Sequence, residues 1–212
     1  GRELGAARFA AAASDFNQRH LADLPGAERL VRIYNGLDLD RFRAGGHAPE
    51  AVPLVLGVGR LVEKKGFDDL IRASARLSTD GVDHRCRIVG SGEEAARLAG
   101  LAHGLGAGRT SLDGPLPREA LLELYPRASV FAAPCVVGAD GNRDGLPTVL
   151  IEAMALGVPV VATPVTGIPE LVVHEETGLL VPERDPAALA AAIRRLLADR
   201  ALAARLAAAA RA

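Results

Sequence analysis

The chain has 212 residues, of which 49% are hydrophobic and 24% charged, with a formal net charge of −1. This length and composition predict one large globular domain with a substantial core. The near-neutral charge and an aromatic content of 3% exclude a broadly basic nucleic-acid surface and a platform of base-stacking side chains. Cys86 and Cys135 match no metal or redox spacing, so we expect two buried thiols in a reducing compartment.

The sequence contains no secretory signal and no apolar run long enough to cross a bilayer. It therefore predicts a cytoplasmic location. The chain begins without a methionine and ends in an Ala-rich stretch that has no closing feature. We expect from this that it is a piece of a longer protein.

The first elements are short and partly ambiguous. The Ala-rich opening, up to about residue 20, permits a helix, but residues 9–13 could instead form a short strand. In that case Ser14 or Asp15 would cap a helix that continues to about residue 24. Residues 31–34 predict a strand that ends at the turn signal Asn35-Gly36, and residues 45–53 form a Gly/Pro-bearing linker.

Apolar runs then alternate with amphipathic stretches. Strands are predicted at residues 54–58, 87–89, 110–112, 130–133, 158–163 and 178–181. Helices are predicted at 67–77, 93–105, 118–125, from Pro147 to about 156, from 186 to 197, and from 199 to the end. This alternation predicts an α/β fold with a doubly wound parallel sheet, Rossmann-like, whose strands all end at one edge, where ligands bind.

The stretch from residue 144 to 157 predicts a loop that turns into a helix. Pro147 suits the first helical position and Gly157 the position just past the end. The free N–H groups and the partial positive charge of such a helix start favour a phosphate. Asp144 precedes that start and Glu152 follows it by one turn, so a diphosphate flanked by hydroxyl-rich groups would fit. The alternative is a loop acid and a solvated helix stripe.

Charged and glycine-rich turns follow the first two strands of this sheet. Arg60 and Lys65 could clamp a diphosphate, or could belong to a solvated charged loop together with Glu63 and Lys64. Gly90 and Gly92 either let a ligand approach the backbone or form a tight turn before a helix. Both alternatives stay open at each position.

Residues 144–163 resemble the signature of family 4 retaining glycosyltransferases, which have the GT-B fold. The signature is a Glu, seven residues, a second Glu, and then Ala-Met-Ala-x-Gly-x-Pro-Val-Val-Ala-Thr. Asp144 stands at the first acidic position, where the family has Glu, and Glu152 stands at the second. The Gly-Arg-Leu-Val-x-x-Lys-Gly run at 59–66 is a further mark of the family, and the resemblance extends over about residues 35–197.

The resemblance implies roles for individual residues. Arg60 and Lys65 would bind the pyrophosphate of a nucleotide sugar without a metal or other cofactor, Asp144 would hold donor-sugar hydroxyls, and Glu152 the ribose diol. At Leu116 the contact would be to the nucleobase and largely through the backbone. Further contacts to the substrate are expected from Gly59, Gly90, Gly92, Gly145, Leu146, Pro147 and Thr148.

The resemblance also implies a division of the chain and a function. Residues 1–45 would be the remnant of an acceptor-binding domain and hinge, 46–198 the domain that binds a UDP- or GDP-sugar, and 199–212 a C-terminal helix. The function would be retaining transfer of a sugar to a hydroxyl in polysaccharide or glycolipid biosynthesis. We expect these residues alone to turn over little or nothing.

Partners other than the nucleotide sugar would be reached through the upstream domain of such proteins. They are an acceptor sugar, lipid or glycan and the inner face of a membrane; no nucleic acid is expected. Two alternatives are a non-catalytic nucleotide-sugar-binding module of the same fold and a nucleotide-sugar epimerase.

Overall fold

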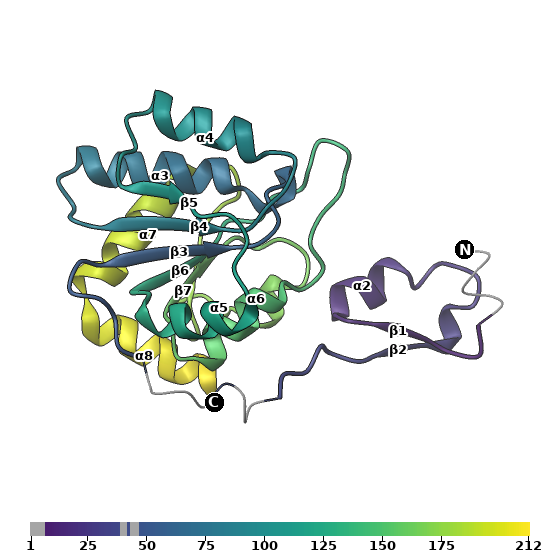
Figure 1. The fold of residues 1–212 in the computed structure, drawn as a ribbon. Coiled ribbons are helices and arrows are strands. Elements are labelled where there is room, and N and C mark those ends of the chain that lie inside the picture. Colours follow the sequence, from purple (N-terminus) through teal and green to yellow (C-terminus); the bar gives the residue numbers. More distant parts are fainter. Residues whose placement is uncertain (1–6, 39–41, 43–46) are drawn as a thin grey trace.

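The computed structural model describes residues 7–38, 42 and 47–212 (Figure 1). A six-stranded sheet, parallel throughout, lies at its centre in the order β5-β4-β3-β6-β7-β8. The strands are β3 (Leu54–Val58), β4 (Arg85–Val89), β5 (Thr110–Leu112), β6 (Val130–Ala133), β7 (Val160–Ala162) and β8 (Leu179–Leu180). The doubly wound parallel sheet predicted from the sequence is therefore confirmed.

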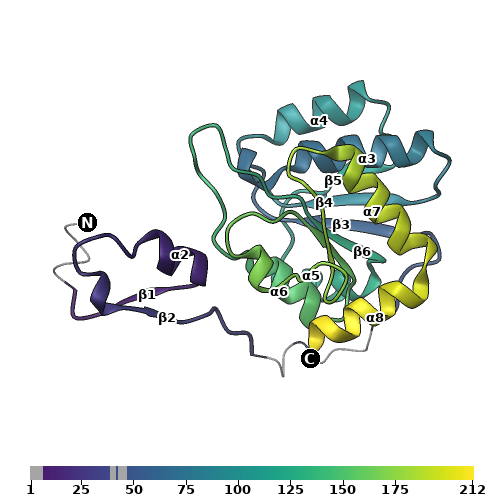
Figure 2. The same cartoon turned by 180° about the vertical axis from the view of Figure 1, so that it is seen from behind.

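Helices cover both faces of this sheet (Figures 1 and 2). They are α3 (Phe67–Thr79), α4 (Ala95–Gly104), α5 (Arg118–Leu124), α6 (Thr148–Ala155), α7 (Pro186–Ala198) and α8 (Arg200–Arg211). Short 3₁₀ turns lie at η3 (Glu63–Lys65), η4 (Tyr125–Arg127) and η5 (Ile168–Glu170). None of the helices in the described ranges is long and apolar enough to span a membrane.

The core has two halves because successive strand residues point to opposite faces of the sheet. Val55 and Val130 pack with α3, α4 and α7 on one face, whereas Leu56 and Phe131 pack with α5 and α6 on the other. Central parallel strands are covered on both sides, so they are continuous apolar runs. This is why the bounds of β3 and β6 agree with the sequence prediction; those of β5, at the edge of the sheet, agree as well.

A small unit formed by the N-terminal residues lies beside the sheet domain (Figure 1). Here β1 (Ala10–Ala12) pairs in parallel with β2 (Leu30–Arg32), and α2 (Asp15–His20) and η1 (Ala27–Arg29) connect them. Ser14 caps α2 by accepting a hydrogen bond from the N–H of Asn17 at 3.1 Å. The structure thus selects the strand and the Ser14 cap, and ends the helix at His20.

One side chain of the sheet domain joins it to this small unit. The carboxylate of Glu170 accepts hydrogen bonds from the N–H groups of Asp15, at 2.8 Å, and Phe16, at 2.9 Å, and from the Tyr34 hydroxyl, at 3.0 Å. Glu170 therefore satisfies free N–H groups at the start of α2 from outside the helix. The N-terminal unit is held against the loop that follows β7.

Two predicted features near turns differ from the structure, and a third is not tested. No turn forms at Asn35-Gly36; residues 33–38 continue without one, because β1 and β2 are parallel and no strand among the described residues returns to pair antiparallel with β2. Residues 39–41 and 43–46, which include the start of the predicted linker, lie outside the described residues. Pro147 is the N-cap of α6 rather than its first helical residue, with φ −65° and an extended ψ of 117°.

Candidate functional site

The site lies where the strand order reverses direction. From β3 the chain proceeds to β4 and β5 on one side, and then returns to β6 on the other. In such sheets ligands bind at the carboxyl ends of the strands on either side of this switch point. The turn after β3 and the loop after β6 meet there, because the N–H of Val136 donates to the carbonyl of Lys64 at 3.0 Å.

Glycines let these turns approach one another closely. A Cβ added to Gly66, whose φ is +62°, would lie 1.9 Å from the carbonyl oxygen of Pro134. One added to Gly90 would lie 1.8 Å from the carbonyl oxygen of Gly59, and one added to Gly92 would lie 2.3 Å from that of Leu61. Backbone packing therefore requires Gly90 and Gly92 whether or not a ligand binds, which favours the tight-turn interpretation.

Three charged side chains meet beside the start of α6. The Nζ of Lys65 lies 2.5 Å from Oδ2 of Asp144, and the Nζ of Lys64 lies 3.3 Å from Oδ1. Only 12% of the Lys65 and Asp144 side chains and 14% of the Lys64 side chain are exposed. Asp144 is therefore not an ordinary loop acid, and the turn after β3 is not simply a solvated charged loop.

The two lysines determine the ionisation of Asp144. Burial by itself would raise the pKa of this carboxyl group, but Lys65 and then Lys64 outweigh it, and the pKa lies below its ordinary value. Asp144 is thus ionised at neutral pH. The Lys65 stem also lies over Gly59, whose added Cβ would be 3.1 Å from Cε, so the turn itself fixes the position of this lysine.

The backbone that carries Asp144 is anchored from the loop after β7. The N–H of Gly167 donates to the carbonyl of Gly145 at 3.0 Å, and the Thr166 hydroxyl donates to the same oxygen at 2.7 Å. Leu146 and Pro147 are buried, whereas Thr148, the first residue of α6, is exposed. The start of α6 therefore stays open to a ligand, with its first N–H groups free of intrahelical acceptors.

A shallow hollow of about 200 Å³ opens beside this cluster, between the ends of β3, β4 and β5. The exposed Arg60 belongs to its lining and forms no ion pair with any described carboxylate. Its walls are formed by Val58, Gly59, Arg60, Val89, Gly90, Ser91, Pro115, Leu116 and Leu121. The structure thus brings four predicted residues to one hollow, Gly59, Arg60, Gly90 and Leu116, but not Gly92. Lys65 and Asp144 are in direct contact next to it.

Glu152 is a buried acid, not part of a solvated helix stripe. Only 7% of Glu152 is exposed. Its Oε2 accepts a hydrogen bond from the Tyr125 hydroxyl at 3.0 Å, and its Oε1 lies 3.2 Å from Nη1 of Arg118. Both partners come from the α5–η4 segment, which packs beside α6 (Figure 1). The solvated-stripe alternative is therefore wrong.

Sequence reasoning missed three residues at this site. The sequence predicts no binding role for Lys64, which contacts Asp144 as well as Asn142. It does not single out Tyr125 or Arg118, because their contacts with Glu152 join positions 27 and 34 residues apart. For Lys64 the signal was its place beside Lys65; for the other two the sequence gives none.

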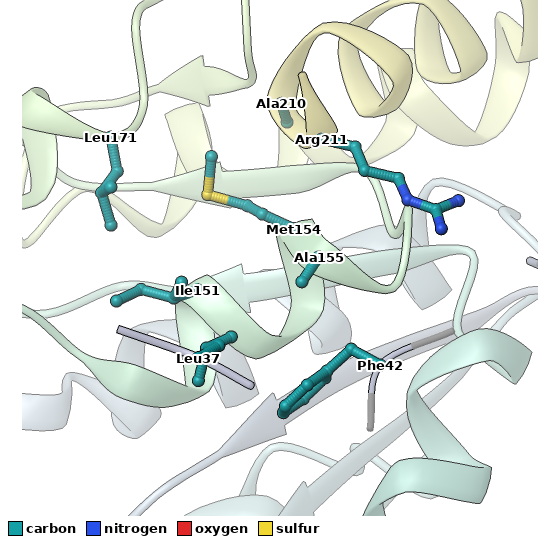
Figure 3. A pocket seen from close by; sticks show the side chains of 8 residues that line it. All are labelled: Leu37, Phe42, Ile151, Met154, Ala155, Leu171, Ala210 and Arg211. Atoms are coloured by element: carbon teal, nitrogen blue, oxygen red, sulfur yellow. The ribbon is translucent and has the colours of Figure 1, made fainter. Parts of the chain in front are cut away.

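Another cavity, of about 370 Å³, lies at a different face of α6 (Figure 3). It is formed mainly by apolar side chains, with one guanidinium at its edge: Leu37, Phe42, Ile151, Met154, Ala155, Leu171, Ala210 and Arg211. It offers no set of polar groups for a diphosphate or a sugar. Among the described residues, no three His, Cys, Asp or Glu side chains gather as a metal site.

Comparison with known proteins identifies the family of the chain and agrees with its fold. Residues 39–212 match the family described as glycosyl transferases group 1. The WcaL protein of Escherichia coli K12, named as a colanic acid biosynthesis glycosyltransferase, is 41% identical over 165 residues, covering 77% of this chain and 41% of that protein. The GDP-mannose-dependent alpha-(1-6)-phosphatidylinositol monomannoside mannosyltransferase of Mycobacterium tuberculosis is 38% identical over 187 residues, covering 82% and 48%.

The same fold occurs in solved structures of GT-B glycosyltransferases. The crystal structure of Anabaena Alr3699/HepE with UDP and glucose matches with a TM-score of 0.84 and 25% identity, covering 97% of this chain and 57% of that one. The chain matches 41% of the length of WcaL and 48% of the length of the mannosyltransferase. From its fold, its family match and these relatives, the chain belongs to the group 1 family of glycosyl transferases.

Proposed function

We propose that this chain is the donor-binding part of a retaining glycosyltransferase of family 4. It would bind a UDP- or GDP-sugar at the carboxyl edge of its sheet and take part in sugar transfer to a hydroxyl of a sugar, lipid or glycan. The observation that carries this proposal is the contact of Lys65 and Lys64 with Asp144 at the open start of α6.

Transfer breaks the bond between the anomeric carbon and the diphosphate oxygen, and the diphosphate leaves with the bonding electrons. The oxygen of the acceptor hydroxyl forms the new bond to the anomeric carbon, and its proton passes to the leaving diphosphate. Lys65, Lys64, Arg60 and the first N–H groups of α6 would stabilise the charge that develops on it, since fixed donors aimed at developing charge lower the barrier. The role is electrostatic and needs no metal. Asp144 would accept hydrogen bonds from donor-sugar hydroxyls, and Glu152 from the ribose diol.

The proposal assigns the remaining parts of the chain as well. Residues 46–198 would form the donor domain, closed by the helix at 199–212, and residues 1–45 would belong to an acceptor-binding domain and hinge. The two relatives named above are more than twice as long as the matched stretch, which supports an acceptor domain outside these residues. Contact with a membrane would be a property of that domain, in a cytoplasmic protein.

Calorimetric titration with a panel of UDP- and GDP-sugars tests donor binding. We expect at least one to bind with micromolar to millimolar affinity, and the Arg60→Ala/Lys65→Ala double variant to lose that binding. The matched control is Arg72→Ala/Arg76→Ala, which removes two cations from the exposed face of α3. Absence of heat with every nucleotide sugar, or equal binding by both double variants, would defeat the proposal.

A non-catalytic binding module of the same fold is the second candidate, favoured by the aspartate at position 144, where the family has glutamate. An activity assay on the full-length gene product distinguishes the two. The proposal expects transfer with the anomeric configuration of the donor retained, as read by NMR of the product. A binding module would bind the nucleotide sugar and transfer nothing.

A further inference from the structure

Glu152 is held by two side chains that the donor-binding interpretation does not require. The Tyr125 hydroxyl donates to Oε2 at 3.0 Å, and Nη1 of Arg118 lies 3.2 Å from Oε1. Tyr125 is fully buried, and its ring packs on Phe131 with a centroid distance of 5.7 Å. Arg118 also stacks over Phe42, 5.6 Å from the ring centroid. Each partner is itself fixed by an aromatic contact.

This arrangement uses one acceptor position on each oxygen of the carboxylate. An ionised carboxylate offers about four such positions, so about one on each oxygen remains free. Two hydroxyls on adjacent carbons can fill these two positions together, because a carboxylate accepts two parallel hydrogen bonds. A buried carboxylate without partners would be costly, and the tyrosine and the arginine remove most of that cost.

Tyr125 can act only as a donor toward this carboxylate. Burial, reinforced by the charge of Glu152, raises the pKa of Tyr125 well above its ordinary range, so the hydroxyl keeps its proton at any pH of interest. The hydroxyl therefore fixes the plane of the carboxylate. Leu121, one turn before Tyr125 on the same segment, lines the hollow at the ends of β3, β4 and β5.

We propose that Tyr125, together with Arg118, is a positioning residue that orients Glu152 toward the ribose diol and so sets a preference for ribonucleotides over deoxyribonucleotides. This inference rests on the proposed function, because it needs a nucleotide in the cleft. It goes further because it assigns the preference for ribose over deoxyribose to two side chains that act through the Glu152 carboxylate and not through the ligand.

A purely structural role for the same contacts makes a different prediction. If the Tyr125–Glu152–Arg118 group only stabilised the packing of α5 against α6, its loss would lower stability and weaken all nucleotides alike. A positioning role weakens binding only for nucleotides that have the diol. Comparison of each ribonucleotide with its dideoxy form separates the two.

The experiment measures the dissociation constants of UDP, GDP and their 2′,3′-dideoxy forms by calorimetry, for the unmodified chain and four variants. Tyr125→Phe deletes the hydroxyl and keeps the ring, Arg118→Gln removes the charge at a half-exposed position, and Glu152→Gln removes the acceptor charge. Tyr34→Phe is the matched control, because it deletes a tyrosine hydroxyl that contacts Glu170 instead.

We expect the unmodified chain and the Tyr34→Phe control to prefer the ribonucleotide. Tyr125→Phe and Arg118→Gln should each reduce that preference about tenfold, as expected for one hydrogen bond to a charged group, and Glu152→Gln should abolish it. Dideoxynucleotide affinity should stay constant throughout. Arg118→Gln keeps the test valid if Tyr125→Phe unfolds the chain, which thermal melting would reveal.

Each other outcome is decisive. A preference that Tyr125→Phe and Arg118→Gln both leave unchanged, in folded protein, overturns the positioning role while the proposed function stands. A uniform loss for both nucleotide forms assigns the contacts to packing alone and also overturns it. If neither UDP nor GDP binds the unmodified chain, the proposed function fails first.

Discussion

The ion pairs of Asp144 make an unusual prediction for the Asp144→Asn variant. This carboxylate lies 2.5 Å from Nζ of Lys65 and 3.3 Å from Nζ of Lys64, with 12% of its side chain exposed. On the proposed function a diphosphate needs the same two cations. The diphosphate would therefore share Lys64 and Lys65 with the Asp144 carboxylate, whose negative charge repels it.

The size of this competition follows from Coulomb's law. Two unit charges about 5 Å apart interact by about 3 kcal/mol at an effective dielectric constant of about 20. Water and counter-ions that enter the cleft would screen part of this repulsion. We expect a net gain of about 1.4 kcal/mol, so Asp144→Asn should bind UDP or GDP about tenfold more tightly.

The same substitution should lower the stability of the free protein. It leaves two largely buried lysines without their carboxylate, which we expect to cost about 1–3 kcal/mol. For a chain of this length each kcal/mol corresponds to about 2–4 °C in Tm. If the Asp144 carboxylate competes with the ligand, Asp144→Asn should melt at a lower temperature than the unmodified chain without UDP. Its Tm should also rise more than that of the unmodified chain when UDP is added.

The test is a calorimetric titration with UDP and with GDP, together with thermal melting in the presence and absence of each, all at low salt. Asp80→Asn is the control. It also removes one negative charge, but at the C-terminal end of α3, where the Asp80 carboxylate pairs with Arg194. If Asp144→Asn bound both diphosphates no more tightly than the unmodified chain, while Arg60→Ala/Lys65→Ala still abolished binding, the inferred competition at the lysines would be refuted.

Three further predictions concern stability. Gly90→Ala should lower the free energy of unfolding by more than about 2 kcal/mol in a urea titration, because its Cβ would lie 1.8 Å from the Gly59 carbonyl oxygen. Gly100→Ala is the control: open space surrounds this position, and the substitution should raise the free energy of unfolding by up to about 1 kcal/mol. Burial holds the pKa of His84 below its usual 6.5, so unfolding should become easier as pH falls below 6.5, by at most about 1.4 kcal/mol per unit, and His84→Gln should flatten that slope. Glu170→Ala should expose residues 7–38 to limited proteolysis without changing the melting of the sheet domain, since its carboxylate holds the start of α2.

Much of the fold could be predicted from the sequence because its signals are local. The strands at the centre of the sheet are apolar runs bounded by turn residues, and the caps at Ser14, Asp185 and Asp199 each accept a hydrogen bond from an N–H three residues on. The Asn35-Gly36 signal failed because a turn dipeptide forms a hairpin only where a second strand returns antiparallel. Here the neighbouring strand is parallel, which no local pattern reveals.

The candidate site was predictable only in part, for a related reason. The alternation of strands and helices was enough to predict that the turn with Lys65 and the loop with Asp144 would lie at one edge of the sheet, because the carboxyl ends of parallel strands share that edge. It did not predict the ion pair between the two side chains. That Tyr125 contacts Glu152 depends on how η4 packs against α6, and no periodicity in either segment encodes it. The pairing of Lys64 with Asp144 required the fold of the η3 turn, which turns both lysines toward one carboxylate.

The two carboxylate groups of the site share no side-chain partner in the described part of the chain. Asp144 contacts Lys64, Lys65 and the thiol of Cys135, whereas Glu152 contacts the side chains that come from α5 and η4. Independent sites contribute additively to free energy, and groups that share partners do not. On the proposed function, recognition of the diphosphate end and of the ribose end of one ligand would therefore be separable. A change at Asp144 should then alter how tightly every nucleoside diphosphate binds, while a change around Glu152 should weaken the binding only of those that have the ribose diol.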